Sequence, residues 1–195
     1  SESFSDPSRI DDVKVSSNPI PKIQEIKKRT TSGLMKSDGY GGGTANMEFQ
    51  TLTGLPFYNI SPTVSVLYSD VAPKMQHLIS ISDSFSSKNK EIIHFESKIN
   101  YSRNVIYNRL DFDKFVSIDD KKDYNVGYQE IHVSDQSTYN SVLKDLDPKR
   151  SQFFSVITMQ NHAPFIAGEP SDVTASGKDF SEDVNTRLTN YSRLL

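Results

Sequence analysis

The stretch that decides the fold is Gly39-Tyr40-Gly41-Gly42-Gly43-Thr44-Ala45-Asn46-Met47-Glu48-Phe49. Ala45, Phe49 and Leu52 recur at i, i+4 and i+7, which predicts the buried face of a helix. The preceding residues 31–37 are β-prone, so we expect the glycines to form a tight turn from a strand into this helix. Thr44 then lies at the exit of the turn, where backbone N–H groups and the positive end of the helix dipole are concentrated.

A hydroxyl at this position has two interpretations. Thr44 could be the N-cap of the helix, because threonine is a preferred capping residue. It could also be a nucleophile that faces an anionic ligand, since glycines let the backbone approach a phosphate and helix N-termini bind anions. Both remain open on spacing alone, although capping does not require three consecutive glycines.

Composition excludes several classes of function. The chain has 195 residues and no cysteine, which excludes disulfides, thiol catalysis and cysteine metal sites. Its net charge of -3 argues against a general nucleic-acid binder, so we expect no nucleic-acid partner. No apolar run approaches the roughly 18 residues of a membrane span. Because the chain begins at Ser1 without an initiator methionine, we expect it to be a piece of a longer protein.

Strand and helix patterns alternate along the chain. Beyond the helix that ends near Gly54, helices are predicted over residues 21–29, 72–85, 101–110, 134–146 and 181–195, and short strands over 91–94, 112–118 and 153–159. Apolar faces are expected at Ile23 and Ile26, at Met75, Leu78 and Ile79, and at Tyr139, Val142, Leu143 and Leu146. Residues 119–129 are expected to form a polar loop. Residues 153–159 suit a parallel strand covered on both faces. The alternation predicts an α/β layered fold with a mostly parallel sheet.

Several polar residues fall at the ends of these strands, where ligands bind in such sheets. Thr44, His94 and His162 lie at carboxyl ends, and Glu2 would join them if a strand preceded Ser1. Arg103 could donate bidentate hydrogen bonds to a phosphate. We interpret His77 and His132 as structural or surface residues. The spacing of these groups does not by itself identify a metal site.

Residues 41–49 resemble the nucleophile motif of the lipoteichoic acid synthase family, which comprises phosphoglycerol transferases of the sulfatase and alkaline phosphatase-like superfamily. Residues 1–6, 94–103 and 159–165 resemble three further motifs in the family's order, and Asn190-Tyr191-Ser192 resembles its following helix. The resemblance implies a three-layer sandwich of the alkaline phosphatase/sulfatase type. It also implies a partial catalytic domain over residues 1–195, incomplete at both ends, without the opening strand or a later Asp-His pair of metal ligands.

The resemblance further implies a role for individual residues. Thr44 would be both the nucleophile and a metal ligand, and Glu2 would be a second metal ligand. The metal would be Mn²⁺, with Mg²⁺ as a substitute, which suits oxygen ligands. The substrate's phosphate and glycerol would be held by His94, Tyr101, Arg103 and His162. The family usually has Trp or Phe and then Asn before this arginine, whereas Tyr101 and Ser102 stand here.

The implied reaction has two steps. Thr44 would attack phosphatidylglycerol and release diacylglycerol, and a hydroxyl of a growing polyglycerolphosphate chain would then take the glycerophosphate. The implied location is the outer face of a Gram-positive cell membrane, reached through a transmembrane part outside this chain. We expect the 195-residue chain alone to bind metal poorly and to be inactive.

Two alternatives remain. The chain could be another member of the superfamily, such as a phosphoethanolamine transferase or a sulfatase. A sulfatase generally needs a Cys or Ser that matures to formylglycine, which Thr44 cannot provide. It could also be a non-catalytic module that binds a teichoic-acid-like polymer.

Overall fold

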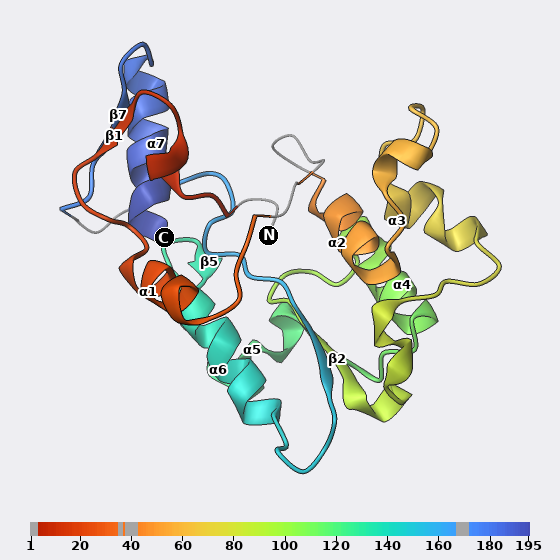
Figure 1. Cartoon of the computed structure of the whole chain (residues 1–195). Coiled ribbons are helices and arrows are strands. Elements are labelled where there is room, and N and C mark those ends of the chain that lie inside the picture. The colour runs from red at the N-terminus through yellow and green to blue at the C-terminus, as the bar shows by residue number, and fades with distance from the viewer. Residues whose placement is uncertain (1–3, 35–36, 38–42, 167–171) are drawn as a thin grey trace. The chain divides into compact units, whose positions relative to one another are not determined.

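The computed structural model describes residues 4–34, 37, 43–166 and 172–195, which form two compact units (Figure 1). The first unit comprises the described parts of Ser37–Gln129, together with Val133–Met159. The second comprises the described parts of Ser3–Lys36, Glu130–His132 and Gln160–Leu195. Two predicted features lie outside the described residues: the metal ligand Glu2, within residues 1–3, and most of the glycine turn, at residues 38–42.

A three-stranded parallel sheet forms the centre of the first unit. Its order is β3 (Lys114–Val116), β2 (Lys90–Ile93) and β6 (Phe153–Val156), with β2 in the middle and buried throughout. The prediction of parallel strands is therefore confirmed. The strand that is covered on both faces is β2, whereas β6 is shorter than predicted and half-buried at the edge of this sheet.

Helices cover both faces of this sheet (Figure 1). Ile92 faces a core built by α2 (Thr44–Thr53), α3 (Leu67–Asp70) and α4 (Arg103–Arg109). Ile93, the next residue, faces the opposite core, where Tyr124 of α5 (Lys121–Tyr124) and Val142 of α6 (Asp135–Asp145) pack. Because adjacent residues of a strand point to opposite faces, one short strand anchors both cores. The α/β layered fold is confirmed in this unit.

Helix α2 has the buried face and the boundaries that its sequence predicts. Ala45 and Phe49 are fully buried and Leu52 nearly so, and the helix ends at Gly54. Its N-cap is Gly43, whose φ of 79° is a backbone conformation that favours glycine. The predicted strand ahead of the glycines is wrong for its described part, since residues 31–34 and 37 have no strand. Residues 31–34 are exposed, so their β-propensity finds no sheet partner.

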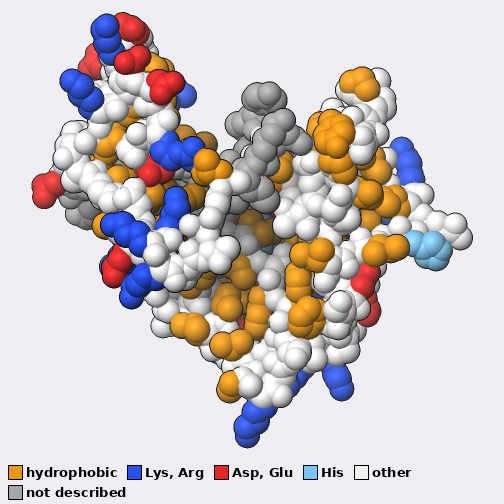
Figure 2. Space-filling view, in the orientation of Figure 1, with side chains coloured by type: hydrophobic (Ala, Val, Ile, Leu, Met, Phe, Trp, Pro, Cys, Tyr) orange, Lys and Arg blue, Asp and Glu red, His pale blue; other side chains and the backbone are white. Residues whose placement is uncertain are grey.

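A two-stranded antiparallel sheet and a long helix build the second unit. β1 (Val13–Val15) pairs with β7 (Ala175–Gly177), and α7 (Glu182–Leu194) packs on β7. The Thr189 hydroxyl accepts from the N–H of Ala175 and donates to its C=O, each at 2.9 Å. Helix α7 thus satisfies the backbone hydrogen-bonding groups of Ala175 in β7. Ser181 caps α7, as predicted. Figure 2 shows charged side chains gathered where α7 begins, and Arg187 pairs there with Asp183 at 3.0 Å.

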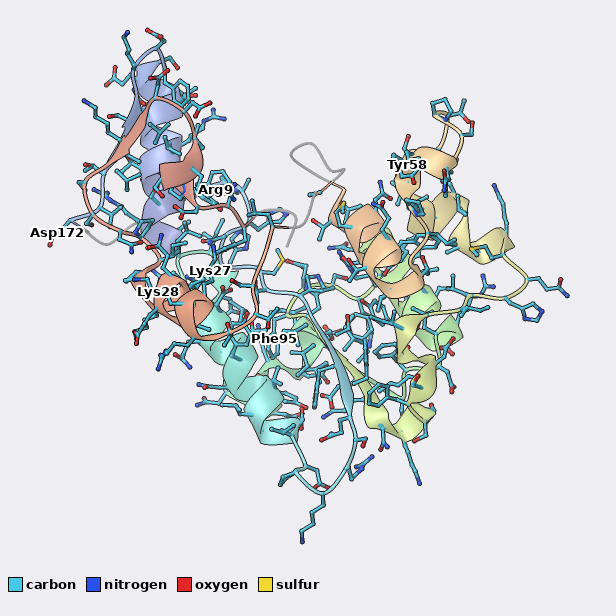
Figure 3. The ribbon with its side chains drawn as sticks, viewed as in Figure 1. Arg9, Lys27, Lys28, Tyr58, Phe95 and Asp172 are labelled. Carbon is cyan, nitrogen blue, oxygen red and sulfur yellow. The ribbon has the colours of Figure 1, made fainter. Side chains whose placement is uncertain are left out.

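The remaining elements are short apart from α1 (Pro21–Arg29), which matches its predicted bounds and carries Lys27 and Lys28 in its last turn (Figure 3). Strands β4 and β5 span Tyr128–Gln129 and His132–Val133. The 3₁₀ turns are η1 (Pro7–Arg9), η2 (Phe57–Asn59), η3 (Ala72–Lys74), η4 (Ile81–Ser84), η5 (Ser87–Asn89), η6 (Asn100–Ser102) and η7 (Ile118–Asp120). The predicted polar loop over residues 119–129 therefore contains α5 and β4.

No helix in the described ranges has the length and apolar character that crossing a membrane requires.

The prediction of one helix over residues 72–85 is wrong. Two separate turns, η3 and η4, stand there instead. Pro73 suits the first turn only, and Ser80 starts η4 with a capping box that includes Asp83. Met75 and Leu78 pack against the core as expected, but Ile79 is 71% exposed.

One predicted apolar helix face is wrong and a second is right only in part. Ile23 and Ile26 of α1 are largely exposed. Tyr139 and Leu143 of α6 and Leu146 at its C-cap are also exposed, whereas Val142 packs against the core as predicted. The side of α6 that is buried carries Thr138 and Ser141. Their hydroxyls donate to the carbonyls of Ser134 and Ser137, at 3.2 and 2.8 Å, so these polar side chains can be buried with their hydrogen bonds made.

Candidate functional site

Thr44 is the first helical residue of α2 and is half-buried. The N-cap position belongs to Gly43, so the capping interpretation of Thr44 is not supported. At the first helical position the hydroxyl stays beside the N–H groups that the helix leaves without an intrahelical partner. This placement is compatible with a nucleophile that faces an anionic group.

Asn46 fixes the start of α2 against a neighbouring loop. Its Oδ1 accepts from the N–H of Leu67 at 2.8 Å, and its Nδ2 donates to the carbonyl of Ser65 at 2.9 Å. Its own N–H donates to the carbonyl of Gly43 at 2.8 Å. Three hydrogen bonds thus hold the backbone next to Thr44, which makes its position well defined.

Arg103 is buried and bound to Glu48 of α2. Its Nε donates to both Glu48 carboxylate oxygens, at 3.1 and 3.0 Å, and its Nη2 donates to Oε1 at 2.5 Å. The two side chains are 4% and 9% exposed. Glu48 follows Thr44 by four residues, which places both on the same face of α2. Helix α2 therefore carries both the proposed nucleophile and the anchor of the proposed phosphate-binding arginine.

The charge of Arg103 is stabilised in this buried place. Burial alone would lower the pKa of Arg103, but its hydrogen bonds and ion pair with Glu48 outweigh burial and raise that pKa above its usual value. Burial, with the charge of Glu48 contributing, raises the pKa of the nearby phenols Tyr68 and Tyr107. The Tyr107 hydroxyl also lies 2.8 Å from the Ser155 hydroxyl. Both phenols therefore stay neutral beside the ion pair.

Tyr101 and Ser102 break the helix that was predicted over residues 101–110. Both have left-handed backbones, with φ of 55° and 57°, and α4 begins only at Arg103. Such a conformation costs a non-glycine residue about 1–2 kcal/mol. It brings the Tyr101 ring over the guanidinium of Arg103, 5.0 Å from the ring centroid. Residues in this conformation cluster at ligand sites, which supports a functional role for this turn.

His94 directly follows the central strand, as predicted, and is buried. The backbone N–H of His94 donates to the carbonyl of Val116 at 2.9 Å, which extends the pairing of β2 with β3 by one residue. Its Nδ1 lies 3.2 Å from the carbonyl oxygen of Ile157. A carbonyl only accepts, so Nδ1 carries a proton and donates this hydrogen bond. The next residue, Phe95, is labelled in Figure 3. Its ring packs on Tyr124, with 6.0 Å between the centroids.

His162 lies in the second unit, in the segment after β6, and is exposed. Its Nδ1 lies 2.6 Å from the carbonyl oxygen of Ala163. Its ring packs edge-on against His132, with 5.6 Å between the centroids. His132, interpreted from the sequence as a structural or surface residue, therefore neighbours a proposed site residue. No spacing signal in the sequence links the two histidines.

The structure thus joins some of the predicted site residues. Thr44, Arg103 and Tyr101 are connected in the first unit through α2 and Glu48, and His94 ends the central strand of the same unit. His162 belongs to the second unit. Glu2 lies outside the described residues. Sequence reasoning missed Glu48, whose position in the glycine-rich motif was its only signal.

A metal ion would need ligands beyond those described. Within residues 4–34, 37, 43–166 and 172–195, no three His, Cys, Asp or Glu side chains gather as a metal site. Thr44 is the one described residue of the predicted pair, since Glu2 lies outside. A hydroxyl and a carboxylate are the hard oxygen ligands that Mn²⁺ and Mg²⁺ prefer, so the predicted pair fits these ions chemically.

A shallow hollow of about 480 Å³ runs along α7 in the second unit. Its lining consists of Glu182, Asn185, Thr186, Thr189, Asn190 and Arg193. None of the predicted site residues lines it, so it is not the candidate site.

The sequence profile of the sulfatase family matches residues 1–195, the whole chain. The chain belongs to the sulfatase family. Among solved structures it is similar to the Streptococcus pyogenes phosphoglycerol transferase GacH in complex with sn-glycerol-1-phosphate, with 49% identity and a TM-score of 0.93. That match covers 98% of this chain and 51% of GacH, so the chain spans about half of that relative.

Two further relatives are more distant. The lipoteichoic acid synthase LtaP from Listeria monocytogenes is 18% identical, with a TM-score of 0.60, over 94% of this chain and 45% of LtaP. At that identity the match shows similarity of fold alone. A protein of Rhizobium meliloti (strain 1021) named for cyclic β-1,2-glucan modification is 30% identical over 170 residues, 86% of this chain and 25% of that protein. The predicted membership of the sulfatase superfamily and the likeness to phosphoglycerol transferases are confirmed.

Proposed function

We propose that this chain is part of the catalytic domain of a phosphoglycerol transferase, in which Thr44 takes up a glycerophosphate group. The observation that carries the proposal is the 49% identity, at a TM-score of 0.93, to a phosphoglycerol transferase bound to sn-glycerol-1-phosphate. Thr44 at the start of α2, with Arg103 anchored one turn further along, supports it from the structure.

In the first step the Thr44 hydroxyl oxygen attacks the phosphorus of phosphatidylglycerol. A bond forms between that oxygen and phosphorus, and the bond from phosphorus to the diacylglycerol oxygen breaks. The proton that Thr44 loses ends on the released diacylglycerol. In the second step an acceptor hydroxyl attacks the same phosphorus, the bond to Thr44 breaks, and the acceptor's proton restores the Thr44 hydroxyl.

The other proposed residues bind the substrate. Arg103 donates hydrogen bonds to phosphate oxygens, and the Tyr101 ring covers its guanidinium. His94, whose Nδ1 donates to the Ile157 carbonyl, contacts the phosphate or glycerol of the substrate. His162 is a further contact to the phosphate or glycerol. Glu2 and Thr44 would hold Mn²⁺ or Mg²⁺, and such an ion, when bound, lowers the pKa of a coordinated hydroxyl.

The proposed donor, phosphatidylglycerol, is a membrane lipid, so we place the protein at the outer face of a bacterial cell membrane. The proposed acceptor is a growing polyglycerolphosphate chain, as in lipoteichoic acid synthesis. A saccharide acceptor is the second candidate, because one relative, 30% identical, is named for the modification of a glucan. The two acceptors share the same threonine intermediate and differ only in the second step.

The test is a transfer assay with the full-length product of the reading frame. Phosphatidylglycerol labelled in its acyl chains is supplied with Mn²⁺, and the release of labelled diacylglycerol is measured with polyglycerolphosphate or an oligosaccharide as acceptor. We expect release that Thr44→Ala abolishes and that Thr51→Ala, a change at an exposed threonine of the same helix, leaves intact. Equal release by the wild-type protein and Thr44→Ala would contradict the proposal.

A further inference from the structure

We infer that Glu48 is a positioning residue, which aims the guanidinium of Arg103 at the phosphate group that Thr44 attacks. The inference rests on the proposed function, because it assigns a second residue to the same site.

The pattern of hydrogen bonds leaves one side of the guanidinium for a ligand. Glu48 occupies the edge formed by Nε and Nη2. A guanidinium has five N–H groups, and Glu48 uses one on Nε and one on Nη2. Among the described residues only Glu48 accepts from this guanidinium, so the two hydrogens of Nη1 and the second hydrogen of Nη2 remain for a ligand. These three donors lie on the side away from Glu48, in the fork geometry that matches phosphate oxygens.

The position of Glu48 on α2 sets where that side lies. Residues four apart on a helix are neighbours on its surface, with Cβ atoms about 5–6 Å apart. An arginine bound to Glu48 is therefore held within a side chain's reach of Thr44. Because Asn46 fixes the same turn of α2 to the Leu67 and Ser65 backbone, the nucleophile and this anchor share one rigid element.

Two further contacts restrict the guanidinium. The Tyr101 ring lies over the guanidinium of Arg103, with 5.0 Å from Cζ to the ring centroid. This contact limits rotation of the guanidinium away from the orientation in which it binds Glu48. Burial of both partners, at 4% and 9% exposure, keeps water from competing for these bonds. An arginine so fixed loses little conformational entropy when it binds an anion, which raises its affinity.

A purely structural ion pair would share the burial and the short contacts. The two roles differ in what happens to ligand affinity in molecules that remain folded. If Glu48 only stabilises the fold, Glu48→Gln lowers the free energy of unfolding and leaves affinity unchanged. If Glu48 positions Arg103, the same change weakens anion binding, and it does so only while Arg103 is present.

The experiment measures the dissociation constant of sn-glycerol-1-phosphate by calorimetry, with neutral glycerol as a comparison. The proteins are the full-length wild type, Glu48→Gln, Arg103→Ala and the double variant, each checked for folding by near-UV circular dichroism. Glu25→Gln is the matched control, since Glu25 forms an exposed helical ion pair with Arg29 at 3.0 Å. We expect about tenfold weaker binding for Glu48→Gln, no change for Glu25→Gln, and no added loss when Glu48→Gln is combined with Arg103→Ala.

Unchanged affinity in folded Glu48→Gln, or an equal further loss in the Arg103→Ala background, overturns the inference alone. If Glu48→Gln does not fold, Glu48→Asp keeps the charge but shortens its reach by one methylene, and the same two outcomes decide the matter. A wild-type protein that binds no sn-glycerol-1-phosphate and releases no diacylglycerol overturns the proposed function and this inference together.

Discussion

The hydroxyl of Tyr191 makes two hydrogen bonds with the backbone of Ser5: it accepts from the N–H at 2.7 Å and donates to the carbonyl at 3.0 Å. The Tyr191 ring packs on Phe165, with 5.3 Å between centroids, and Asn190 donates to the Phe165 carbonyl at 2.9 Å. Helix α7 therefore holds together, within the second unit, the segment after Glu2 and the segment after His162. These are two of the segments that the proposed function requires.

Replacing Tyr191 by phenylalanine tests this connection. Tyr191→Phe keeps the ring contact but removes both bonds to Ser5, so we expect the free energy of unfolding to fall by about 1–3 kcal/mol. Urea denaturation measures it. Tyr139→Phe is the control, because Tyr139 is 54% exposed on α6, and we expect no change there. Equal stability of the two variants would mean that the bonds to Ser5 contribute nothing.

Stability should depend on pH through Glu91. Burial, and a hydrogen bond with Asp145, raise the pKa of Glu91 to about 7, although Lys114 lies 3.1 Å away and favours its charge. The folded protein then holds a proton that the unfolded chain releases near its ordinary pKa of 4.5. Stability from this group is therefore fully present below pH 4.5 and is lost as pH rises to about 7.

Urea denaturation at pH 5 and at pH 8 measures this effect. We expect a loss on the order of 1–2 kcal/mol for the wild type, after allowance for solvent screening, and a smaller loss for Glu91→Gln. The pKa of Asp145, the partner of Glu91, shifts in the opposite direction: burial opposes its charge, but Lys114 at 2.8 Å and the Tyr124 hydroxyl hold its pKa below 3.8. Its contribution is present above that value and is lost only in stronger acid. An identical pH dependence in Glu91→Gln would assign the loss to another group.

Backbone conformation at Ser102 offers a further test. With φ at 57°, Ser102→Asn introduces a residue that tolerates this region better than other non-glycine residues. We expect a small gain in the free energy of unfolding, and a loss of about 1–2 kcal/mol for Ser102→Val, since β-branched residues are disfavoured there. Thermal unfolding of both variants gives the order of stability, and a more stable valine variant would refute a left-handed backbone at this position.

Gly43 should resist substitution because it caps α2 with φ of 79°. Gly43→Ala is expected to lower the free energy of unfolding by about 1 kcal/mol. Gly33→Ala is the matched control, because an added Cβ at Gly33 meets nothing within 4 Å and the residue has no positive φ. If both alanine variants unfold at the same urea concentration, the left-handed cap does not limit residue choice.

The parts of the fold that local signals determine could be predicted from the sequence. Ala45, Phe49 and Leu52 share one face by period alone, and Gly54 and Ser181 mark helix ends through their own backbone and side-chain chemistry. The run at residues 153–159 predicted a parallel strand but not its place in the sheet. Whether a strand is central or at the edge depends on which others pair with it.

What could not be predicted depends on distant contacts or on satisfied polar groups. The buried side of α6 carries Thr138 and Ser141, whose hydroxyls form hydrogen bonds within the helix. The pattern of hydrophobic residues therefore predicted a face that is largely exposed. Glu48 and Arg103 are 55 residues apart, and no periodicity links them. Thr44 and His94 were placed as candidates by position at element ends, and the structure keeps both at such ends.

The most direct test of the account is the intact mass of the full-length protein after incubation with phosphatidylglycerol and Mn²⁺ without an acceptor. We predict a mass gain of one glycerophosphate group, located by peptide fragmentation on Thr44 and absent in Thr44→Ala. No gain in a wild-type protein that demonstrably binds Mn²⁺, or the same gain in Thr44→Ala, would contradict the claim that Thr44 is the nucleophile.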